Sequence, residues 1–548
     1  MQVKQAYARP STASSDSKGM HFDLSAELSR PPVSINALIK NSRAYGRIML
    51  ALREVVTGDW RAKIQDYSKY QEWVYQRYLE ELPLIYGKVL EQHSKLLEEK
   101  AALKNEIALV QDVIKPIRQT LWQARRKYYN WLYKHNRDMW ILLDPVISVH
   151  PDAVIFEAFS LDESCYGRVT VPSNLLEVFG QTDYGTTNID FSQALADELY
   201  RVRSYRPAWL KVAFEQVELS TSAGSSVEKK IDLPESWVRG FLQVQSASSL
   251  PGTRLTLSST TLNEVLSVLA KNKTKVSPRS IRFRLKKGEC PTIVLDPWNI
   301  EIKEPKHIYQ GEKEGEIRIW GRRRLHVLSS LLAYSETVEV LLLGTGMPSY
   351  WSTSIDGHRF DIGLSGWTSN DWAQKGNFDL LASTSNDGLK YVEEIEKHLV
   401  KHLAGTPEQF AEWAQIPRPS ATAALQELCK QGRAMYDHIK GEYRWRQLLQ
   451  EDIKLEESED DKRLTYAIGL VKDNKIKQLS MKKEDGLRKM KFEVYGKNTF
   501  KPHIHLDSDG RVKYAECTCS FFRRNKLRMG PCQHIIAATI WSGKQNWD

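Results

Sequence analysis

The chain has 548 residues, of which 41% are hydrophobic and 27% charged, which excludes an intrinsically disordered protein and is enough to build several hydrophobic cores. Its net charge of +10 is spread over the whole length, so the charge does not by itself indicate a nucleic-acid-binding protein. No apolar run approaches the roughly eighteen residues of a membrane helix, and residues 1–19 lack the hydrophobic centre of a secretory signal. We therefore expect a cytoplasmic protein that does not enter a membrane.

The N-terminal part is predicted to be a flexible tail and lead-in segment over residues 1–58, followed by long helices over residues 59–139. Apolar residues recur in the second segment at sevenfold spacing, at Leu82, Val89, Leu96, Leu103, Val110 and Ile117. This spacing is typical of a coiled coil or a long helical arm. The arm could pair within the chain or with a second copy, so self-association is one predicted partnership.

The middle of the chain has short β-branched runs, at residues 154–156, 168–171, 281–285 and 317–320, separated by helical patterns. We interpret residues 140–250 and 251–385 as two mixed α+β domains. The turn at residues 344–349 lacks the third glycine and the lysine of a phosphate-binding loop, and no nucleophile, acid and base are recognisable by their spacing. We therefore expect no enzymatic activity, with an enzyme hidden in these domains as the weaker alternative.

Residues 386–450 are predicted to form a winged-helix-like module. Helices are expected at 391–403, from Thr406 with Pro407 at its first position, and at 420–431, followed by two strands at 433–437 and 442–446. The third helix carries only Glu427 and Lys430 as charges, which favours docking to a protein over reading DNA. The best phosphate candidates in this module are Arg444 and Arg446. Residues 451–463 are mostly acidic and are interpreted as a solvated linker.

The C-terminal segment, residues 464–548, contains four soft metal ligands in CxC…CxH order: Cys517, Cys519, Cys532 and His534. Three thiolates and one imidazole complete the tetrahedron of a structural Zn²⁺ site and leave no position for a reacting water. The first two cysteines are expected on one face of a strand, and the second pair at the start of a helix over 535–541. Zinc is thus the predicted cofactor, with a binding role.

The spacer between the two ligand pairs is basic. Its four cationic residues, Arg523, Arg524, Lys526 and Arg528, lie beside Phe521 and Phe522. Basic side chains next to exposed aromatic rings could hold phosphates and stack bases. The alternative is a solvated loop whose phenylalanines turn into the small core of the finger.

The runs at 515–520 (AECTCS) and 530–537 (GPCQHIIA) resemble the SWIM zinc finger. Residues 185–192 (GTTNIDFS) and 363–372 (GLSGWTSNDW) are similar to stretches of large bacterial SWIM-family proteins. The resemblance implies zinc and contact with protein or nucleic acid. Bacterial relatives of this size are often encoded with a MoxR-type AAA+ ATPase and a von Willebrand A domain protein, so these are the partners it implies.

The expected fold class is therefore multidomain α+β: an N-terminal long-helix or coiled-coil region, mixed α/β middle domains, a winged-helix-like module and a C-terminal SWIM zinc finger. The expected function is that of a zinc-binding, non-enzymatic adaptor that mediates protein interactions. The alternative is a DNA- or RNA-binding protein that uses the finger and the winged helix.

Overall fold

A computed structural model describes residues 3–5, 12–15, 20–25, 33–58, 145–188, 199–200, 202, 208–213, 231–233, 235–274, 278–366, 371–372, 378–381, 389–448, 459–484, 486–496 and 498–543. The helical region predicted at 59–139 lies outside the described residues, as do residues 451–458 of the predicted linker. Among the described residues, no helix is both long and apolar enough to cross a membrane.

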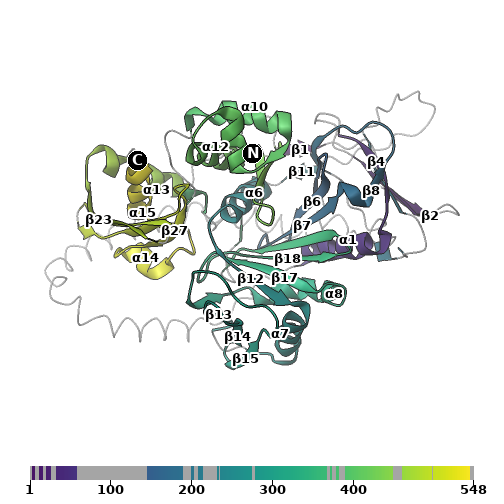
Figure 1. Cartoon of the computed structure of the whole chain (residues 1–548), viewed down its shortest axis with the longest axis horizontal. Coiled ribbons are helices and arrows are strands. Elements are labelled where there is room, and N and C mark those ends of the chain that lie inside the picture. Colours follow the sequence, from purple (N-terminus) through teal and green to yellow (C-terminus); the bar gives the residue numbers. More distant parts are fainter. Residues whose placement is uncertain are drawn as a thin grey trace, which may run out of the picture. The chain divides into compact units, whose positions relative to one another are not determined.

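The largest sheet of the described residues is an antiparallel sheet of eight strands (Figure 1). Its order is β12-β17-β18-β19-β7-β6-β5-β9. The strands are β5 (Val146–Val149), β6 (Ala153–Phe159), β7 (Cys165–Pro172), β9 (Gly185–Asn188), β12 (Thr253–Ser258), β17 (Thr337–Leu342), β18 (Ser349–Ile355) and β19 (His358–Leu364). This sheet thus contains strands from before and after residue 250, where a domain boundary was predicted. Strands β7 and β19 are the neighbouring pair that connects the two groups of strands.

A helix packs against each face of this sheet. Helix α1 (Ser42–Thr57) lies on one face so closely that a Cβ at Gly167 would come within 3.0 Å of Leu52. Helix α6 (Glu235–Ser248) lies on the other, where the Tyr350 hydroxyl donates to the Val244 carbonyl over 2.8 Å. Strands β6 and β7 are consequently buried on both faces.

Two smaller sheets contain the N-terminal strands β1 to β4. Strands β2 (Thr12–Ser15), β3 (Met20–Ser25), β10 (Ala208–Ala213), β4 (Ile35–Ile39) and β8 (Leu176–Val178) form one in the order β2-β3-β10-β4-β8. Strands β1 (Val3–Gln5) and β11 (Ile231–Leu233) form an antiparallel pair.

A four-stranded antiparallel sheet is inserted between β12 and β17. Its strands, in the order β15-β14-β13-β16, are β13 (Ile281–Leu285), β14 (Thr292–Leu295), β15 (Ile300–Lys303) and β16 (Gly315–Ile319). The helices of this region are α7 (Ser259–Lys271), the 3-10 helix η3 (Arg322–Leu328) and α8 (Ser329–Leu332). The remaining 3-10 helices are η2 (Ser173–Leu175) and η4 (Asp379–Leu381).

Residues 392–445 contain three helices and a three-stranded sheet. The elements are α10 (Val392–His402), β20 (Ala404–Gly405), α11 (Pro407–Ala414), α12 (Arg418–Lys430), β21 (Ala434–Asp437) and β22 (Glu442–Trp445), with sheet order β20-β22-β21. Thr406 caps α11 through a reciprocal hydrogen-bonded box with Gln409. The three predicted helices and the two predicted strands are confirmed.

The C-terminal elements are one layer of strands and three helices, drawn in yellow-green and yellow in Figure 1. The strands are β23 (Ile476–Glu484), β24 (Leu487–Tyr495), β25 (Thr499–Phe500), β26 (His503–Leu506) and β27 (Val512–Glu516). The helices are α13 (Glu459–Lys472), the short α14 (Ser520–Asn525) and α15 (Gln533–Gly543). Residues 459–461, predicted as linker, form the first turn of α13.

The predicted fold class is wrong. The described strands form six sheets, and every named strand pair except β3–β10 is antiparallel. The middle of the chain is built around one antiparallel sheet rather than two mixed α/β domains. The pairing of β7 with β19 joins strands from both predicted domains, and strand pairing leaves no short-range signal in the sequence.

Candidate metal centre

Two loops of the C-terminal layer bring the four predicted ligands together. Strand β27 ends at Glu516, so Cys517 lies just past the strand, and Cys519 caps the N-terminus of α14, where its sulfur accepts a hydrogen bond from the Phe522 amide over 3.4 Å. The expected position of both cysteines on a strand is therefore wrong, because the chain turns into a helix that the sequence did not predict. Cys532 directly precedes α15 and His534 is in its first turn, as predicted.

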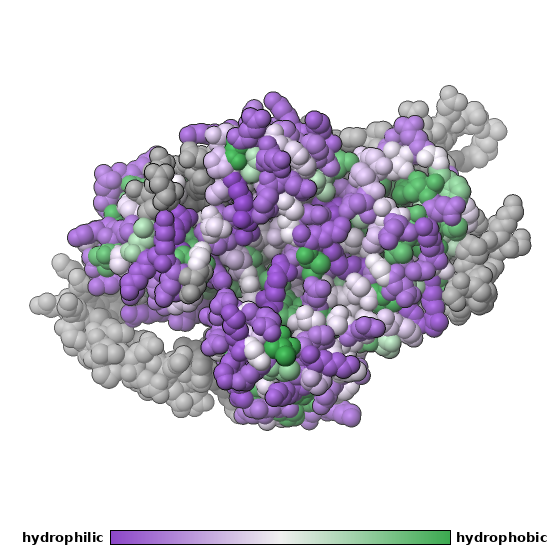
Figure 2. Space-filling model, viewed as in Figure 1, coloured by the Kyte–Doolittle hydropathy of each residue, from purple (hydrophilic) through white to green (hydrophobic). Residues whose placement is uncertain are grey.

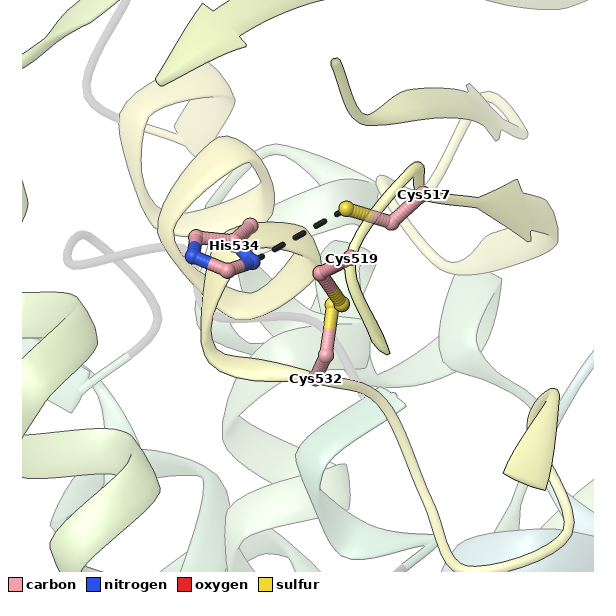
Figure 3. A group of neighbouring side chains, drawn as sticks. All are labelled: Cys517, Cys519, Cys532 and His534. Atoms are coloured by element: carbon pink, nitrogen blue, oxygen red, sulfur yellow. Dashed lines mark hydrogen bonds between the residues drawn. The ribbon is translucent and has the colours of Figure 1, made fainter. Parts of the chain in front are cut away.

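The ligand atoms converge on one point. Those of Cys517, Cys519, Cys532 and His534 all lie within 4.8 Å of one another, and all four residues are buried. Figure 3 shows the three sulfurs and the imidazole directed toward one another, with the Cys517 sulfur 3.8 Å from Nδ1 of His534. A tetrahedral zinc with bonds of about 2.3 Å to sulfur and about 2.0 Å to nitrogen separates its ligand atoms by about 3.5 to 3.8 Å. The cluster could thus bind a metal ion with little movement.

The electrostatics of the cluster also favour a cation. Hydrogen bonds among the sulfurs raise the pKa of Cys517 to about 12, lower the pKa of Cys519 and raise that of Cys532 strongly. The cluster cannot hold three thiolates side by side without a positive charge between them. A dication would stabilise all three together, and the N-terminus of α15 adds a favourable partial charge.

Two residues hold the ligand loops in place. Arg463 of α13 donates hydrogen bonds to the carbonyls of Met529 and Pro531, at 3.1 and 2.9 Å, and its guanidinium lies 4.9 Å from the centre of the Phe521 ring. Phe500 stacks on the His534 imidazole with ring centres 4.2 Å apart. The sequence gives no short-range signal for these contacts, because Arg463 is 68 residues before Pro531.

A cavity of about 360 Å³ adjoins the cluster. Aromatic side chains line much of it: Tyr466, Tyr495, Phe500 and Phe521. Cys519, Cys532 and His534 form part of its wall. Tyr466 and Tyr495 are 50% and 40% exposed. The finger therefore presents an open aromatic surface beside its metal ligands.

The four basic residues of the spacer have different environments. Arg523, Arg524 and Lys526 are exposed. Arg528 is half-buried: it donates to the carbonyls of Arg524 and Asn525, and its aliphatic part packs against Gly346. Phe522 is 7% exposed and is covered by Lys526, so its ring cannot stack on a base. The interpretation in which the phenylalanines turn inward fits Phe522, and three of the four cations remain accessible.

Arg444 and Arg446 do not fit the predicted phosphate contacts. Arg444 is 1% exposed and donates hydrogen bonds to both oxygens of Asp152, at 2.6 and 2.7 Å. Arg446 is fully buried against Glu157. A phosphate at Arg444 would have to displace Asp152. A phosphate at Arg446 would have to displace Glu157, which would leave a buried carboxylate unpaired. Both arginines instead attach residues 392–446 to the eight-stranded sheet and its β5–β6 turn.

Helix α12, the third helix of that module, is also covered. Nine of its residues are buried: Ser420, Ala421, Thr422, Ala423, Ala424, Leu425, Gln426, Leu428 and Cys429. Gln426 donates to the hydroxyl of Ser249, just beyond α6, over 3.4 Å. The small side chains therefore serve close packing, as the sequence indicated, and the helix is not available to a DNA groove.

No protein-family model and no curated protein matches the chain. Among solved structures, it is similar to a chain of the PCNA2–PCNA3 complex from Sulfolobus tokodaii (10% identity, 44% of this chain, 94% of that chain, TM-score 0.28). It is also similar to proliferating cellular nuclear antigen from Entamoeba histolytica (11% identity, 41% of this chain, 89% of that chain, TM-score 0.29). These TM-scores are too low to support an argument about fold or function.

Proposed function

We propose that this protein is a zinc-dependent, non-enzymatic adaptor related to the SWIM zinc-finger proteins. The observation that carries the proposal is the closed set of three cysteines and one histidine, all buried and within 4.8 Å of one another. Soft thiolates and an imidazole in a tetrahedral arrangement favour Zn²⁺ over the harder Mg²⁺ and Ca²⁺. With four protein ligands, the metal has no open position for a substrate, so its role is to hold the finger together.

The proposed partner surface is the one next to the metal. Helix α14 contributes Phe521 to the wall of the aromatic cavity and exposes Arg523 and Arg524 beyond it. Exposed aromatic residues and arginines are enriched at protein–protein interfaces. The chemistry fits a partner segment with an apolar anchor and acidic flanking residues. Given the resemblance to bacterial SWIM proteins, a MoxR-type AAA+ ATPase is the first partner to test, followed by a von Willebrand A domain protein.

A second candidate function is nucleic-acid binding through the same finger. It is supported by the exposure of Arg523, Arg524 and Lys526, which could contact phosphates, and of Tyr466 and Tyr495, which could stack on bases. Because Arg444, Arg446 and nine residues of α12 are buried, the module predicted at residues 386–450 does not offer these groups to a nucleic acid. We therefore favour the adaptor.

A binding experiment with the full chain separates the two functions. The zinc-loaded protein and its Arg523→Glu/Arg524→Glu variant are titrated with the MoxR-type ATPase encoded nearest to it and, separately, with single-stranded RNA and DNA. A variant with matched charge reversals on exposed residues of α10, Lys397→Glu/Lys401→Glu, is the control.

Under the adaptor proposal, the ATPase binds the wild type and the control equally and the finger variant at least about tenfold more weakly, a loss of about 1.4 kcal/mol. Nucleic acid then binds weakly at physiological salt. If the ATPase binds none of the three proteins while nucleic acid binds tightly and loses affinity in the finger variant, the second function replaces the first.

A further inference from the structure

Four polar side chains gather on the outer face of β26 and β27, outside the thiolate cluster. The strands pair so that His503 lies opposite Glu516 and His505 opposite Tyr514. Because side chains alternate along a strand, these four residues share one face. The alternate residues Ile504 and Leu506 are 0% and 2% exposed in the core on the other face. The backbone thus holds two imidazoles side by side at the surface.

The imidazoles are oriented by their neighbours. Nε2 of His503 lies 3.0 Å from Nε2 of His505. On the far side of the first ring, Nδ1 of His503 lies 3.2 Å from a carboxylate oxygen of Glu516, whose other oxygen accepts a hydrogen bond from the Tyr514 hydroxyl over 2.7 Å. When Nδ1 of His503 carries the ring proton and donates a hydrogen bond to this carboxylate, the lone pair of His503 is on Nε2. That lone pair faces His505. A carboxylate behind a histidine in this way is the usual support of a metal-binding imidazole.

The separation of the two nitrogens indicates the geometry of an ion between them. With metal–nitrogen bonds of about 2.0 to 2.1 Å, nitrogens at this separation subtend an angle of about 91° to 97° at the metal. A tetrahedral ion would need them about 3.3 Å apart or more. Angles near 90° belong to square-planar or octahedral ions, and imidazole is a preferred ligand of Ni²⁺ and Cu²⁺.

We propose that His503 and His505 form a second metal site, separate from the thiolate centre, that chelates a divalent ion of tetragonal preference such as Ni²⁺ or Cu²⁺. The two Nε2 atoms take adjacent positions in the coordination sphere, and water completes it. Glu516 is a positioning residue that holds the tautomer of His503. On binding the ion, His505 moves its proton from Nε2 to Nδ1, so no proton is released from the pair.

The charges around the two histidines determine how tightly they bind a cation. Strand β24 places Lys489 opposite His505 and Lys491 opposite His503. The ammonium of Lys489 is paired with Glu484 at 2.8 Å, and Glu516 supplies a negative charge next to the histidines. Lys491 is exposed on the same face and opposes a dication. Its replacement by glutamine should therefore tighten binding, an effect that a merely structural histidine pair would not produce.

The site is tested by calorimetric titration of the zinc-loaded full chain with NiCl₂, because Ni²⁺ is not reduced by the neighbouring thiols. Zinc content and thermal unfolding of each variant are measured first. We expect one Ni²⁺ per chain beyond the zinc, lost in His503→Gln and in His505→Gln. We also expect binding about 10- to 100-fold weaker in Glu516→Gln and tighter in Lys491→Gln.

His402→Gln is the control, since His398 and His402 form the other close pair of histidines in the described residues, with ring centres 6.1 Å apart, and His402 stacks on Trp413. The control should bind Ni²⁺ like the wild type. The proposal is overturned if the wild type binds no Ni²⁺, if His503→Gln and His505→Gln bind it unchanged, or if His402→Gln alone abolishes binding.

Discussion

Arg446 donates hydrogen bonds to both carboxylate oxygens of Glu157, at 3.1 and 3.0 Å, although 289 residues separate the two in the chain. Both side chains are fully buried. Glu157 also accepts a hydrogen bond from the Tyr166 hydroxyl over 2.5 Å. This buried ion pair ties the segment that ends at Arg446 to the face of the eight-stranded sheet that α6 covers.

Replacing Arg446 by methionine should destabilise the protein strongly. The change leaves the Glu157 carboxylate buried without its counter-charge, which costs about 3 to 5 kcal/mol. Denaturant unfolding followed by circular dichroism measures the loss. Arg523→Met, at an exposed arginine, is the matched control and should change stability by less than about 0.5 kcal/mol. Equal stabilities of the two variants would contradict the assignment of Arg446 to a buried ion pair.

Removal of the metal should unfold the C-terminal layer and spare the central sheet. Structural zinc contributes roughly 10 to 16 kcal/mol in small fingers, which is as large as the net stability of about 5 to 15 kcal/mol of a whole domain. Hydrogen exchange before and after chelation should show lost protection in α15 and retained protection in β6 and β7. Metal analysis of Cys532→Ser should show less than one zinc per chain, whereas Cys429→Ser, at a buried cysteine outside the cluster, should retain it. Full zinc retention in Cys532→Ser would rule out the proposed ligand set.

Replacing Arg463 by glutamine should weaken metal binding without removing a ligand. The guanidinium fixes the carbonyls of Met529 and Pro531, which precede Cys532, and its loss lets this loop open. Outer contacts of this type typically change metal affinity about 10- to 100-fold. Competition with a chromophoric zinc chelator measures the effect, and Arg488→Gln in β24 serves as a comparison. If the zinc affinity of Arg463→Gln equals that of the wild type, the loop is held by other contacts.

Acid should weaken the contact between residues 392–445 and the eight-stranded sheet before it affects the rest of that sheet. Burial lowers the pKa of His438 to about 3, so this histidine is neutral in the folded protein. The unfolded chain takes up that proton below its ordinary pKa of about 6.5, so stability falls as the pH drops from 6.5 toward 3.

Asp437 adds to the same trend at lower pH. Burial alone would raise its pKa, but the charges of Arg168 and Arg359 outweigh burial and hold the pKa below its usual range. The stability from these ion pairs is complete above the ordinary Asp pKa of about 3.9 and is lost as the pH falls below it. Melting temperatures between pH 7 and pH 4 should decrease, and less steeply in His438→Gln. An unchanged slope in that variant would show that His438 is not the titrating group.

If the second function holds, the spacer cations carry its salt dependence. Replacing Arg523, Arg524 and Lys526 by alanine together should lower the log–log salt slope of single-stranded nucleic-acid binding by roughly 0.7 per lost phosphate contact. Arg528→Ala should leave the slope unchanged, because this arginine is bound to backbone carbonyls. Fluorescence anisotropy at several salt concentrations measures both. A slope that does not respond to the triple replacement would place the nucleic acid elsewhere.

The sequence alone determined the elements whose signals are local. The four candidate metal ligands occur within eighteen residues, and the Thr406 cap and Pro407 mark the start of α11 within one helical turn. For such features, the distance along the chain already limits the distance in space. The short spacing of Cys517 and Cys519 therefore predicted the cluster correctly, even though the strand expected to carry both cysteines ends at Glu516, before either of them.

The tertiary structure decided everything that depends on partners far apart in the chain. The sequence could not show that Arg444 and Arg446 meet Asp152 and Glu157, because an exposed arginine and a buried, paired one have the same local pattern. Nor could it show that strands β7 and β19 pair, or that His503 lies opposite Glu516, since strand pairing has no short-range period beyond the alternation of faces. A charged residue or a histidine forms a binding site only when the pairing of strands places suitable side chains opposite it.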